Sequence, residues 1–399
     1  MDELTAGDEA RRSERSAMLG ANQLLMRERN ERLVLSLVRK HGPLSKSEIA
    51  RMTGLSAQAG SVIMRGLEHE GLLEKQAPVR GKVGQPLVPM NLAADGAFFL
   101  GLKVGRRRTE LMLIDFRGSV LGSEVQRHDY PTPDATVAFA RSATASLLTR
   151  LDASQRKRIA GFGIGLPFQL WNWAGALQVP QHAMADWRHR DIRAELAEEM
   201  AWPVVLENDA TAACNAELVF GTSDLPRNFL YAFLGFFIGG GLVLNGTLFT
   251  GSFGNAGALA SMLVPDGTGK VRQLVSVASL SELERQLETG SARLWESADT
   301  WDVDEAVLDA WMDQAAAGLA HAAIAAVAVC DLEALVIDGW LPEPLRQRLV
   351  AKTEIAFTGL DLAGIRCPQV LSGTVGPMAR VLGAASLPLS MRFLVDLGA

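Results

Sequence analysis

The stretch SKSEIARMTGLSAQAGSVIMRGLEHEG, residues 45–71, decides the fold of the first part of the chain. Ser45, followed three residues later by Glu48, makes a capping-box pattern, which predicts that a helix begins here. Residues 54–56, Gly-Leu-Ser, predict a tight turn, and a second helix is expected over about 57–70. Two short helices joined by a glycine-containing turn are typical of a helix-turn-helix.

Each of these helices should bury one face. From the apolar spacing we expect Ile49 and Met52 to face the core from the first helix. We expect Val62, Ile63 and Leu67 to do so from the second. The remaining faces of both helices are then free to meet a partner.

The flanking sequence completes a winged helix-turn-helix. Residues 30–40 (NERLVLSLVRK) place apolar side chains on one helical face, which predicts a preceding helix. Residues 72–75 and 86–91 are strand candidates on either side of a loop rich in Gly, Arg and Lys, residues 78–85. Three helices followed by two strands and a basic loop form this class of DNA-binding domain.

The second helix of such a pair enters the major groove of DNA, which is wide enough to admit it. The candidate DNA-contacting residues are Ser45, Lys46 and Ser56 at the helix starts, Gln58, Ser61 and Arg65 on the outward face, and Arg80, Lys82 and Gln85 in the wing. Backbone N–H groups at helix starts favour phosphate, while Gln suits adenine and Arg suits guanine. The alternatives are a three-helix scaffold that binds a protein, or a charged face that is only solvated.

The charge distribution agrees with an anionic partner for the front of the chain. Residues 22–90 carry 11 Lys and Arg against 6 Asp and Glu, whereas residues 91–399 carry 25 against 34. A basic segment before an acidic body suggests nucleic acid. Three widely spaced cysteines predict neither a disulfide framework nor a zinc cluster. No apolar signal segment opens the sequence, so we expect a cytoplasmic protein without a membrane span.

The rest of the chain alternates helices and strands, which predicts an α/β body. Strands are expected at 97–103, 110–115, 120–125, 159–167, 204–207, 228–234 and 239–244, and helices at 135–151, 191–200 and 209–220. Asn245-Gly246 is a strong hairpin signal after the last of these strands. The alanine-rich residues 315–330 are too short an apolar run to span a bilayer, so we expect a buried helix there.

Several short motifs of the body resemble those of the ROK family (repressors, open reading frames and kinases). The motifs are Leu206-Glu207-Asn208-Asp209-Ala210, Ile238-Gly239-Gly240-Gly241, Asn245-Gly246 and Gly254-Asn255-Ala256-Gly257. With the front segment, the whole chain resembles the xylose- and N-acetylglucosamine-responsive repressors of that family. The resemblance implies an actin-like, ribonuclease-H-like body of two lobes around a cleft. In the wing, Gln85 replaces the arginine of the family's Gly-Arg-Pro phrase.

The chain departs from this family where the kinases bind ATP. The resemblance implies an Asp-x-Gly-Gly-Thr phosphate loop, but residues 103–109 read KVGRRRT, with Lys103 in place of the Asp. The second phosphate loop reads Gly235-Phe236-Phe237 in place of Gly-Thr-Gly. Bulky side chains there would prevent close approach to phosphate, so ATP binding is expected to be lost. Residues 267–274 lack the family's zinc cysteines, and we expect neither a metal nor a cofactor.

Most of the family's sugar contacts are also replaced. Asn208 and Asp209 remain, and the resemblance adds Gly165 and Asn255 as candidate ligand-binding residues. The family's kinases use this aspartate as general base, a role that needs a phosphate donor site. Without that site, two interpretations stay open: the pair recognises a ligand hydroxyl, or it only caps the helix that begins there.

These observations predict a sequence-specific DNA-binding transcriptional regulator, a repressor with a non-catalytic body, that acts as a homodimer or homotetramer. A sugar-like or other small effector would occupy the cleft between the lobes. The alternatives are a sugar kinase with an appended DNA-binding head, or a scaffold without a ligand. The expected division of the chain is a flexible tail at 1–21, the winged helix-turn-helix at 22–91, a first lobe at 92–206 with about 385–399, and a second lobe at 207–384.

Overall fold

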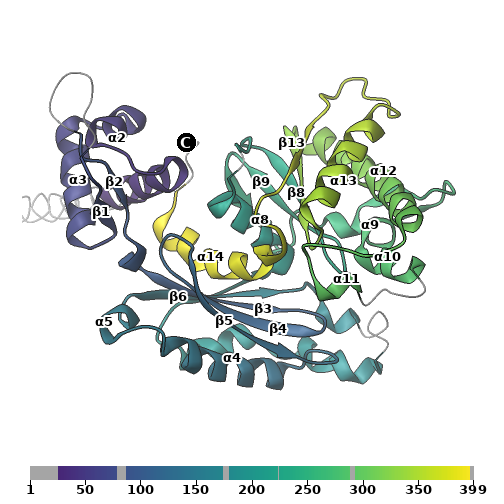
Figure 1. Cartoon of the computed structure of the whole chain (residues 1–399), viewed down its shortest axis with the longest axis horizontal. Helices are drawn as coiled ribbons and strands as arrows, with labels where there is room; N and C mark the ends of the chain where they lie inside the picture. The colour runs from purple at the N-terminus through teal and green to yellow at the C-terminus, as the bar shows by residue number, and fades with distance from the viewer. Residues whose placement is uncertain (1–25, 79–86, 174–178, 223, 288–292, 396–399) are drawn as a thin grey trace, which may run out of the picture. The chain divides into compact units, whose positions relative to one another are not determined.

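The computed structural model describes residues 26–78, 87–173, 179–222, 224–287 and 293–395. Internal contacts group the chain into two units. The first, called the head here, is Met1–Ala97 with Ser390–Leu397, and the second, called the body, runs over Phe98–Leu389. The alternation of helices and strands in the body confirms the predicted α/β class (Figure 1).

The head contains the predicted helix-turn-helix. Residues 26–41 form its first helix, followed by α2 (Lys46–Thr53) and α3 (Ala57–His69). Strands β1 (Leu73–Lys75) and β2 (Met90–Leu92) pair antiparallel as the base of the wing.

The local signals explain why the chain folds this way. The capping box at α2 is formed, because the Ser45 Oγ accepts from the Glu48 N–H at 3.3 Å and the Glu48 carboxylate accepts from the Ser45 N–H at 2.8 Å. Gly54 ends α2 at φ +67°, a left-handed conformation that disfavours any residue with a Cβ. The tight turn between the two helices therefore depends on this glycine.

Two core assignments in the head are wrong. Ile49, Ile63 and Leu67 are buried as expected, but Met52 is 38% exposed and Val62 is 49% exposed. Met64 takes the inward position on α3 and is fully buried. The helical phase of α3 differs by a fraction of a turn from the expected one, so that Ile63 and Met64 share the buried face.

Residues 391–395, near the C-terminus, pack with the head. The Val395 N–H donates to the Ser36 Oγ at 3.0 Å, and Arg32 donates to the Met391 carbonyl at 3.4 Å. These contacts group Ser390–Leu397 with the first helix of the head, whereas the sequence analysis assigned them to the first lobe of the body.

The first sheet of the body has the strand order β5-β4-β3-β6-β7. Its strands are β3 (Phe98–Val104), β4 (Arg108–Ile114), β5 (Val120–Arg127), β6 (Ile159–Leu166) and β7 (Val204–Asn208). Strands β3 to β5 form an antiparallel meander, and β6 and β7 join β3 in parallel. Their apolar side chains form a core with helices α4 (Pro133–Leu148) and α7 (Ile192–Glu199).

The second sheet repeats this order. Its sequence of strands is β10-β9-β8-β13-β14, again a meander of three with two parallel strands added to the first of them. The strands are β8 (Phe229–Leu234), β9 (Gly239–Leu244), β10 (Thr247–Phe249), β13 (Ala334–Gly339) and β14 (Gln369–Ser372). The turn Asn245-Gly246 joins β9 to β10, with Asn245 at φ +56°. Two sheets of equal topology make the body an actin-like fold.

Shorter elements and helices complete the body. They are α5 (Ala153–Arg156), η2 (Leu170–Trp173), η3 (Gln181–Arg188), α8 (Asp209–Phe220), η4 (Leu259–Ser261), β11 (Leu263–Pro265), β12 (Val271–Gln273), α9 (Val275–Ala278), α10 (Leu280–Gln286), α11 (Arg293–Glu296), α12 (Glu305–Cys330), α13 (Glu343–Phe357), η5 (Gly376–Met378) and α14 (Ala379–Phe393). The one in the head is η1 (Ala94–Gly96).

Helix α14 lies close against the first sheet and α8 because small residues face it (Figure 1). A Cβ on Gly163 of β6 would lie 1.8 Å from the Ala384 carbonyl oxygen, and one on Gly383 would lie 2.0 Å from the Ala212 carbonyl oxygen. No side chain fits in either place. This close packing fixes the start of α14, and with it Arg380, beside the start of α8.

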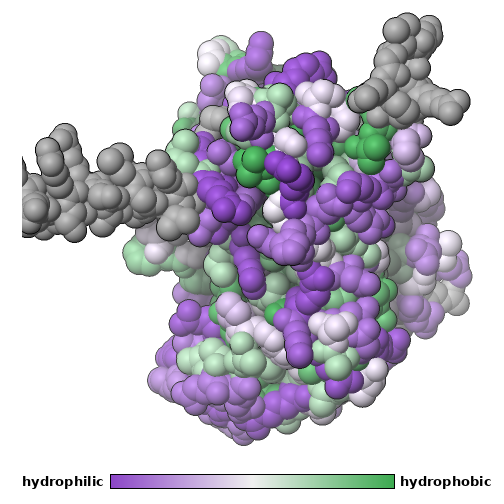
Figure 2. Space-filling model, turned by 90° about the vertical axis from the view of Figure 1, so that its left-hand side faces the viewer, coloured by the Kyte–Doolittle hydropathy of each residue, from purple (hydrophilic) through white to green (hydrophobic). Residues whose placement is uncertain are grey.

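Helix α12 contains the alanine-rich segment. By length and composition alone it is the one helix in the described residues that could cross a membrane. Its Trp311, Met312 and Leu319 are fully buried in the core of the second sheet, which confirms the expected buried helix. Figure 2 shows one face of the molecule, on which hydrophilic residues predominate and apolar ones are scattered.

Candidate nucleic-acid interface and ligand cleft

Helix α3 presents an exposed polar face with one apolar residue. Gln58 and Arg65 are exposed, and Ser61 between them is half-buried. The Arg65 Nε donates to the Ser61 carbonyl at 3.3 Å, which holds the start of the side chain along the helix. Val62, expected in the core, lies exposed on the same helix. Amide, guanidinium and methyl groups are the chemistries that read base edges in the major groove.

The residues at the helix starts differ in accessibility. Lys46 and Ser56 are exposed, and the Ser56 Oγ caps α3 by accepting from the Ala59 N–H at 3.1 Å. Ser45 is only 2% exposed, and its hydroxyl donates to the Glu48 carboxylate at 2.6 Å. Its side chain therefore belongs to the cap of α2 and does not face outward. Arg80, Lys82 and Gln85 lie outside the described residues.

In the body, the first sheet brings Gly165, Asn208 and Asp209 to one edge. Lys103, near the end of β3, pairs with Gly165 of β6, and β7 ends at Asn208. A Cβ on Gly165 would lie 3.6 Å from the Asp209 Cα and 3.6 Å from the Arg380 carbonyl oxygen. The carboxyl ends of neighbouring parallel strands are the usual position of ligands in open sheets.

The two residues of the Asn-Asp pair do different work. The Asn208 side chain caps α8 by accepting from the Ala210 N–H at 3.0 Å and the Thr211 N–H at 3.3 Å. Asp209 is buried, and its Oδ2 lies 3.2 Å from the Arg380 Nε. The capping interpretation thus describes Asn208, while the Asp209 carboxylate is held by a cation.

Arg380 lies against Gly235-Phe236-Phe237, the segment that the resemblance aligns with the second phosphate loop. Its Nη2 donates to the Phe237 carbonyl at 3.2 Å, and its guanidinium lies 4.3 Å from the centre of the Phe233 ring. A Cβ on Gly235 would come within 2.7 Å of the Nη2 atom. The glycine therefore leaves room for an arginine side chain that belongs to this chain.

The Arg106-Arg107-Arg108 run supplies two more cations to the cleft. The Arg106 guanidinium stacks 3.5 Å from the centre of the Phe236 ring and lies 3.7 Å from the Glu284 carboxylate. Burial lowers the pKa of Arg106 to about 10. Arg108 pairs with Glu110 at 3.2 Å and lies 5.2 Å from the centre of the Trp340 ring. Arg106, in the turn between β3 and β4, thus contacts an aromatic residue between β8 and β9, and Arg108, at the start of β4, lies near one that directly follows β13.

Lys103 differs from these arginines because no carboxylate pairs with it. Within the described part of the chain its ammonium has neither a hydrogen bond nor a carboxylate within 4.0 Å. Burial, followed by the charges of Arg108 and Arg380, lowers its pKa to about 8. Lys103 in turn contributes to a lowered pKa at His128, whose main cause is burial and whose Nε2 lies 3.1 Å from the Thr109 Oγ1.

The remaining ligand candidates form no hydrogen bond with this cluster in the described part of the chain. Asn255 lies half-buried in the loop between β10 and η4, and no hydrogen bond joins it to the cluster in the described residues. Three aromatic residues near this part of the sequence, Phe168, Trp173 and Trp187, could also stack on a ligand, but Trp187 is buried and donates to the Pro131 carbonyl at 2.9 Å, so its role is packing. Phe168 is 44% exposed, and the Trp173 side chain lies outside the described residues.

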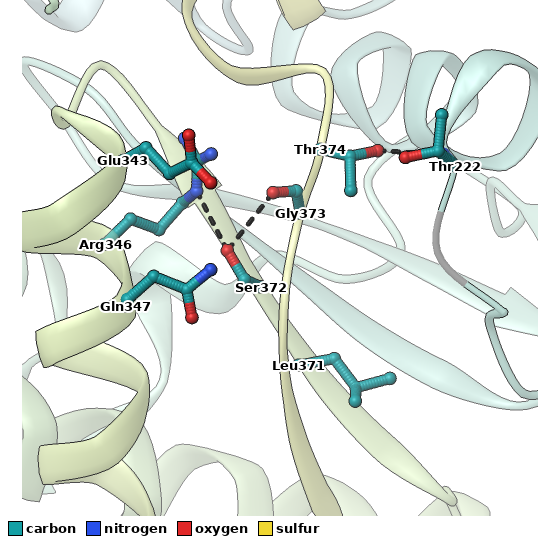
Figure 3. Close-up of a pocket in the computed structure, with 8 residues that line it drawn as sticks. All are labelled: Thr222, Glu343, Arg346, Gln347, Leu371, Ser372, Gly373 and Thr374. Atoms are coloured by element: carbon teal, nitrogen blue, oxygen red, sulfur yellow. Dashed lines mark hydrogen bonds between the residues drawn. The ribbon is translucent and has the colours of Figure 1, made fainter.

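Between α13 and β14 lies a polar pocket of about 460 Å³ (Figure 3). Arg346 points from α13 toward β14 and donates to the Ser372 Oγ at 3.0 Å. Behind it, the Asp338 carboxylate is fully buried and accepts from the Tyr231 hydroxyl at 2.9 Å and from the Gly376 N–H at 3.0 Å. Burial raises the pKa of Asp338, while Arg346, 3.4 Å away, opposes that shift.

The sequence analysis found part of this site. It identified the pair at 208–209 and the altered loops, but it missed Arg380 and did not assign a ligand role to the basic run. The three consecutive arginines were the available signal, whereas nothing in the local sequence marks Arg380. Among the described residues, no group of three or more His, Cys, Asp or Glu could hold a metal ion.

Comparisons with known proteins agree with this geometry. The model of the ROK family matches residues 99–388. An uncharacterized protein of Sinorhizobium fredii, y4fQ, is 26% identical over 91% of both chains. A xylose repressor of Bacillus spizizenii is 25% identical over 61% of this chain and 62% of its own length, so less than two thirds of that relative is covered. A glucokinase of Halalkalibacterium halodurans is 27% identical over 52% of this chain and 64% of its own length.

Solved structures share the fold. A ROK family transcriptional regulator described as a homologue of the E. coli MLC protein superposes with a TM-score of 0.66 at 20% identity, covering 92% of this chain and 97% of the other. A ROK family glucokinase from Streptomyces griseus, in complex with glucose and AMPPNP, gives 0.56 at 21% identity, covering 73% of this chain and 99% of the other.

Proposed function

Because the chain belongs to the ROK family, as the match over residues 99–388 shows, we propose that it is a sequence-specific DNA-binding transcriptional regulator with a non-catalytic body. The observation that carries this proposal is helix α3, a recognition helix whose exposed face bears Gln58 and Arg65. A kinase has no need of such a head. The similarity to xylose repressors supports repression as the mode of action.

The DNA contacts divide into reading and positioning. Gln58, Ser61 and Arg65 read bases, while Lys46 and the start of α3 at Ser56 contact phosphates. Arg80, Lys82 and Gln85 of the wing contact the adjacent backbone or minor groove. The protein binds as a homodimer or homotetramer in the cytoplasm, because a two-fold symmetric site is the usual partner of this head.

The cleft supports the absence of kinase activity. Lys103 replaces the aspartate of the first phosphate loop, and Arg380 and Phe236 fill the second. A magnesium–ATP complex needs carboxylates for the metal and open backbone for the phosphates. The cleft instead serves a small, sugar-like effector, for which Asp209 and Gly165 are ligand-binding candidates. Asn208 acts through its cap on α8, and Asn255 completes the candidate set.

The test is recovery of fragmented genomic DNA by the purified full chain, followed by sequencing. The expected result is a small set of enriched, two-fold symmetric sites. The Gln58→Ala/Arg65→Ala double variant serves as the matched control, since both side chains are exposed and their removal leaves the fold intact. Equal enrichment by the double variant, or uniform recovery of DNA, would overturn the proposal.

A sugar kinase with an appended head is the second candidate. It is favoured by one observation, the retained Asp209 at the position of the family's general base, together with the glucokinase relative. The decisive measurement is ATP-dependent phosphorylation of glucose and xylose by the full chain. Turnover that disappears in Asp209→Asn would establish the kinase, and absence of turnover in the full chain would eliminate it.

A further inference from the structure

A cluster of charged side chains in the body, around Lys103, Asp209 and Arg380, holds more positive than negative charge, although the body as a whole is acidic. Lys103, Arg106, Arg108 and Arg380 converge there, against the carboxylates of Glu110, Asp209 and Glu284. Each arginine has its own carboxylate at 3.2–3.7 Å. Lys103 is the cation left over, and it lies near two of these pairs, those of Arg108 and Arg380.

The unpaired ammonium of Lys103 lowers the stability of the ligand-free protein. Lys103 is half-buried, and two guanidinium groups, those of Arg108 and Arg380, disfavour its charged form more strongly than the carboxylates of Glu110 and Asp209 favour it. Moving an ammonium out of water beside like charges disfavours its charged form. A methionine or leucine would fill the same space without this cost. Ionisable groups whose pKa is shifted by burial and by neighbouring charges cluster at binding and catalytic sites.

The surrounding pairs are also incompletely satisfied. The Arg380 Nε and the Glu110 Oε2 are buried, and neither has a partner in hydrogen-bond geometry, although each lies near an opposite charge. Burying a polar atom without a hydrogen bond costs free energy. An added ligand with several acceptor oxygens would supply the missing partner to Arg380 and a counter-charge to Lys103 at once.

We propose that this cleft binds a small metabolite through an oxyanion, a carboxylate or a phosphate ester, which pairs directly with Lys103, Arg108 and Arg380 without a metal ion. Asp209, at the edge of the same cluster, accepts a hydrogen bond from a ligand hydroxyl. Arg106, stacked on Phe236, bounds the site on the side of the second sheet. The inference rests on the proposed function, since this metabolite is the effector of the regulator.

The reactivity of lysine amines gives a direct test in the full chain. The sequence has eight lysines, and at neutral pH the low-pKa Lys103 should react readily with limiting acetic anhydride. Acetate and inorganic phosphate are the probes, added separately at constant ionic strength up to tens of millimolar. We expect at least one of the two probes to slow the acetylation of Lys103 several-fold and in a saturable manner. The acetylation rate of Lys157, an exposed lysine of the body, should not change. Equal rates at Lys103 with and without both probes would overturn the inference.

A matched set of sugars then tests the ligand class. Glucose, gluconate and glucose 6-phosphate are titrated calorimetrically into the full chain and into Lys103→Met and Lys157→Met. The anionic sugar that binds should do so at least tenfold more tightly than glucose, and Lys103→Met, but not Lys157→Met, should remove this preference. Gluconate and glucose 6-phosphate distinguish carboxylate from phosphate. An anion preference that survives in Lys103→Met would contradict the proposed site.

These outcomes are separable from the regulator itself. Operator recovery by the head with no oxyanion protection at Lys103 would leave the proposed function intact and remove this inference. Protection at Lys103 in a protein that enriches no DNA site would support the oxyanion site and remove the proposed function. The thermal midpoint of Lys103→Met, which should rise, shows independently that the variant is folded.

Discussion

At the scale of single residues, the body contains two charges of opposite sign, one buried and one half-buried. The buried Asp338 accepts two hydrogen bonds at its Oδ2, from a tyrosine hydroxyl and a backbone N–H, and its Oδ1 lies 3.4 Å from the Arg346 guanidinium. Lys103 has two guanidinium groups and two carboxylates, those of Glu110 and Asp209, in its surroundings, and it forms no ion pair with either carboxylate within the described residues. The Asp338–Arg346 pair links the second sheet to α13. The unpaired Lys103 destabilises the folded chain and, in the proposed site, pairs with an anion.

Lys103 should make stability depend on pH in the alkaline range. Its pKa is about 8 in the folded protein and 10.5 as its ordinary value, so between these values the unfolded chain binds more protons. The free energy of unfolding should therefore rise from pH 8 to 10.5, by on the order of 1–2 kcal/mol after solvent screening is allowed for. Lys103→Met should be more stable than the natural chain at pH 7, and this advantage should shrink toward pH 10.5.

Thermal or urea unfolding across this pH range measures the effect. Lys157→Met, which removes an exposed lysine, is the control and should follow the natural chain at every pH. A Lys103→Met variant that is less stable than the natural chain at pH 7 would show that the charged Lys103 does not destabilise the fold.

Removal of Asp338 should be severe. Asp338→Ala leaves the Arg346 guanidinium, 7% exposed, without its counter-charge, and a buried unpaired charge costs about 3–5 kcal/mol. Glu343→Gln removes an exposed carboxylate from the lining of the same pocket and should change stability by less than about 0.5 kcal/mol. Urea unfolding compares the two variants. Partial recovery in Asp338→Ala/Arg346→Met is expected if the unpaired guanidinium is the cause.

At the scale of elements, the winged head was predictable because its signals are local. The capping box at Ser45 and Glu48 and the left-handed Gly54 fix both ends of α2 within the segment itself. The exposure of Val62 and the burial of Met64 were not predictable to that accuracy. Val62 and Met64 lie on either side of Ile63, each about 100° away from it around the helix, and tertiary packing decides which of the two faces inward.

Two glycines of the helix-turn-helix should respond oppositely to one substitution. Gly54→Ala forces a Cβ into the left-handed conformation at φ +67° and should destabilise the head by about 1–2 kcal/mol. Gly66→Ala lies inside α3, where the new Cβ would be 3.7 Å from the nearest atom, an Arg27 nitrogen, and should stabilise by up to about 1 kcal/mol. Urea unfolding followed by circular dichroism checks both signs. A neutral Gly54→Ala would mean that the turn tolerates a different backbone.

The cleft was less predictable because its key contact joins distant parts of the chain. Asp209 and Arg380 are 171 positions apart, and they meet only because glycines and alanines let α14 lie against the first sheet and α8. The sequence around Asp209 predicts a helix start, but nothing around Arg380 marks it as a partner, and no periodic pattern links the two positions. The resemblance to a family located Asp209, whereas the cation that holds it required the structure.

At the scale of the whole molecule, the two sheets have the same strand order, and residues 390–395 belong to the same unit as the first helix of the head. Val395, just after the end of α14, donates to Ser36 in the first helix of the head. Arg380, at the start of α14, lies in the candidate effector site. One continuous helix therefore contributes to both the candidate effector site and the candidate DNA-binding unit. We expect binding at the two sites to be coupled.

Operator binding should depend steeply on salt. Each phosphate neutralised by Lys or Arg contributes about −0.9 to the slope of log affinity against log salt. Lys46→Ala, which removes an exposed lysine at the start of α2, should reduce the slope by about 1 per subunit and weaken all sequences equally. Arg65→Ala should instead cost about 1–3 kcal/mol on the operator and little on unrelated DNA. Fluorescence anisotropy at several salt concentrations separates the two effects.

Coupling between the cleft and the head is subject to a thermodynamic constraint that provides the final prediction. If the oxyanion ligand changes operator affinity by some factor, the operator must change the affinity for the ligand by the same factor, typically about 5–150-fold. Both quantities can be measured on the full chain, one by anisotropy with ligand added and the other by calorimetry with operator added. Lys103→Met should abolish the factor in both measurements while leaving the operator affinity of the ligand-free protein intact, because Lys103 lies in the body and does not touch DNA. If Lys103→Met changed ligand-free operator binding as strongly as the ligand does, Lys103 would control the equilibrium between conformations and not the occupancy of the cleft.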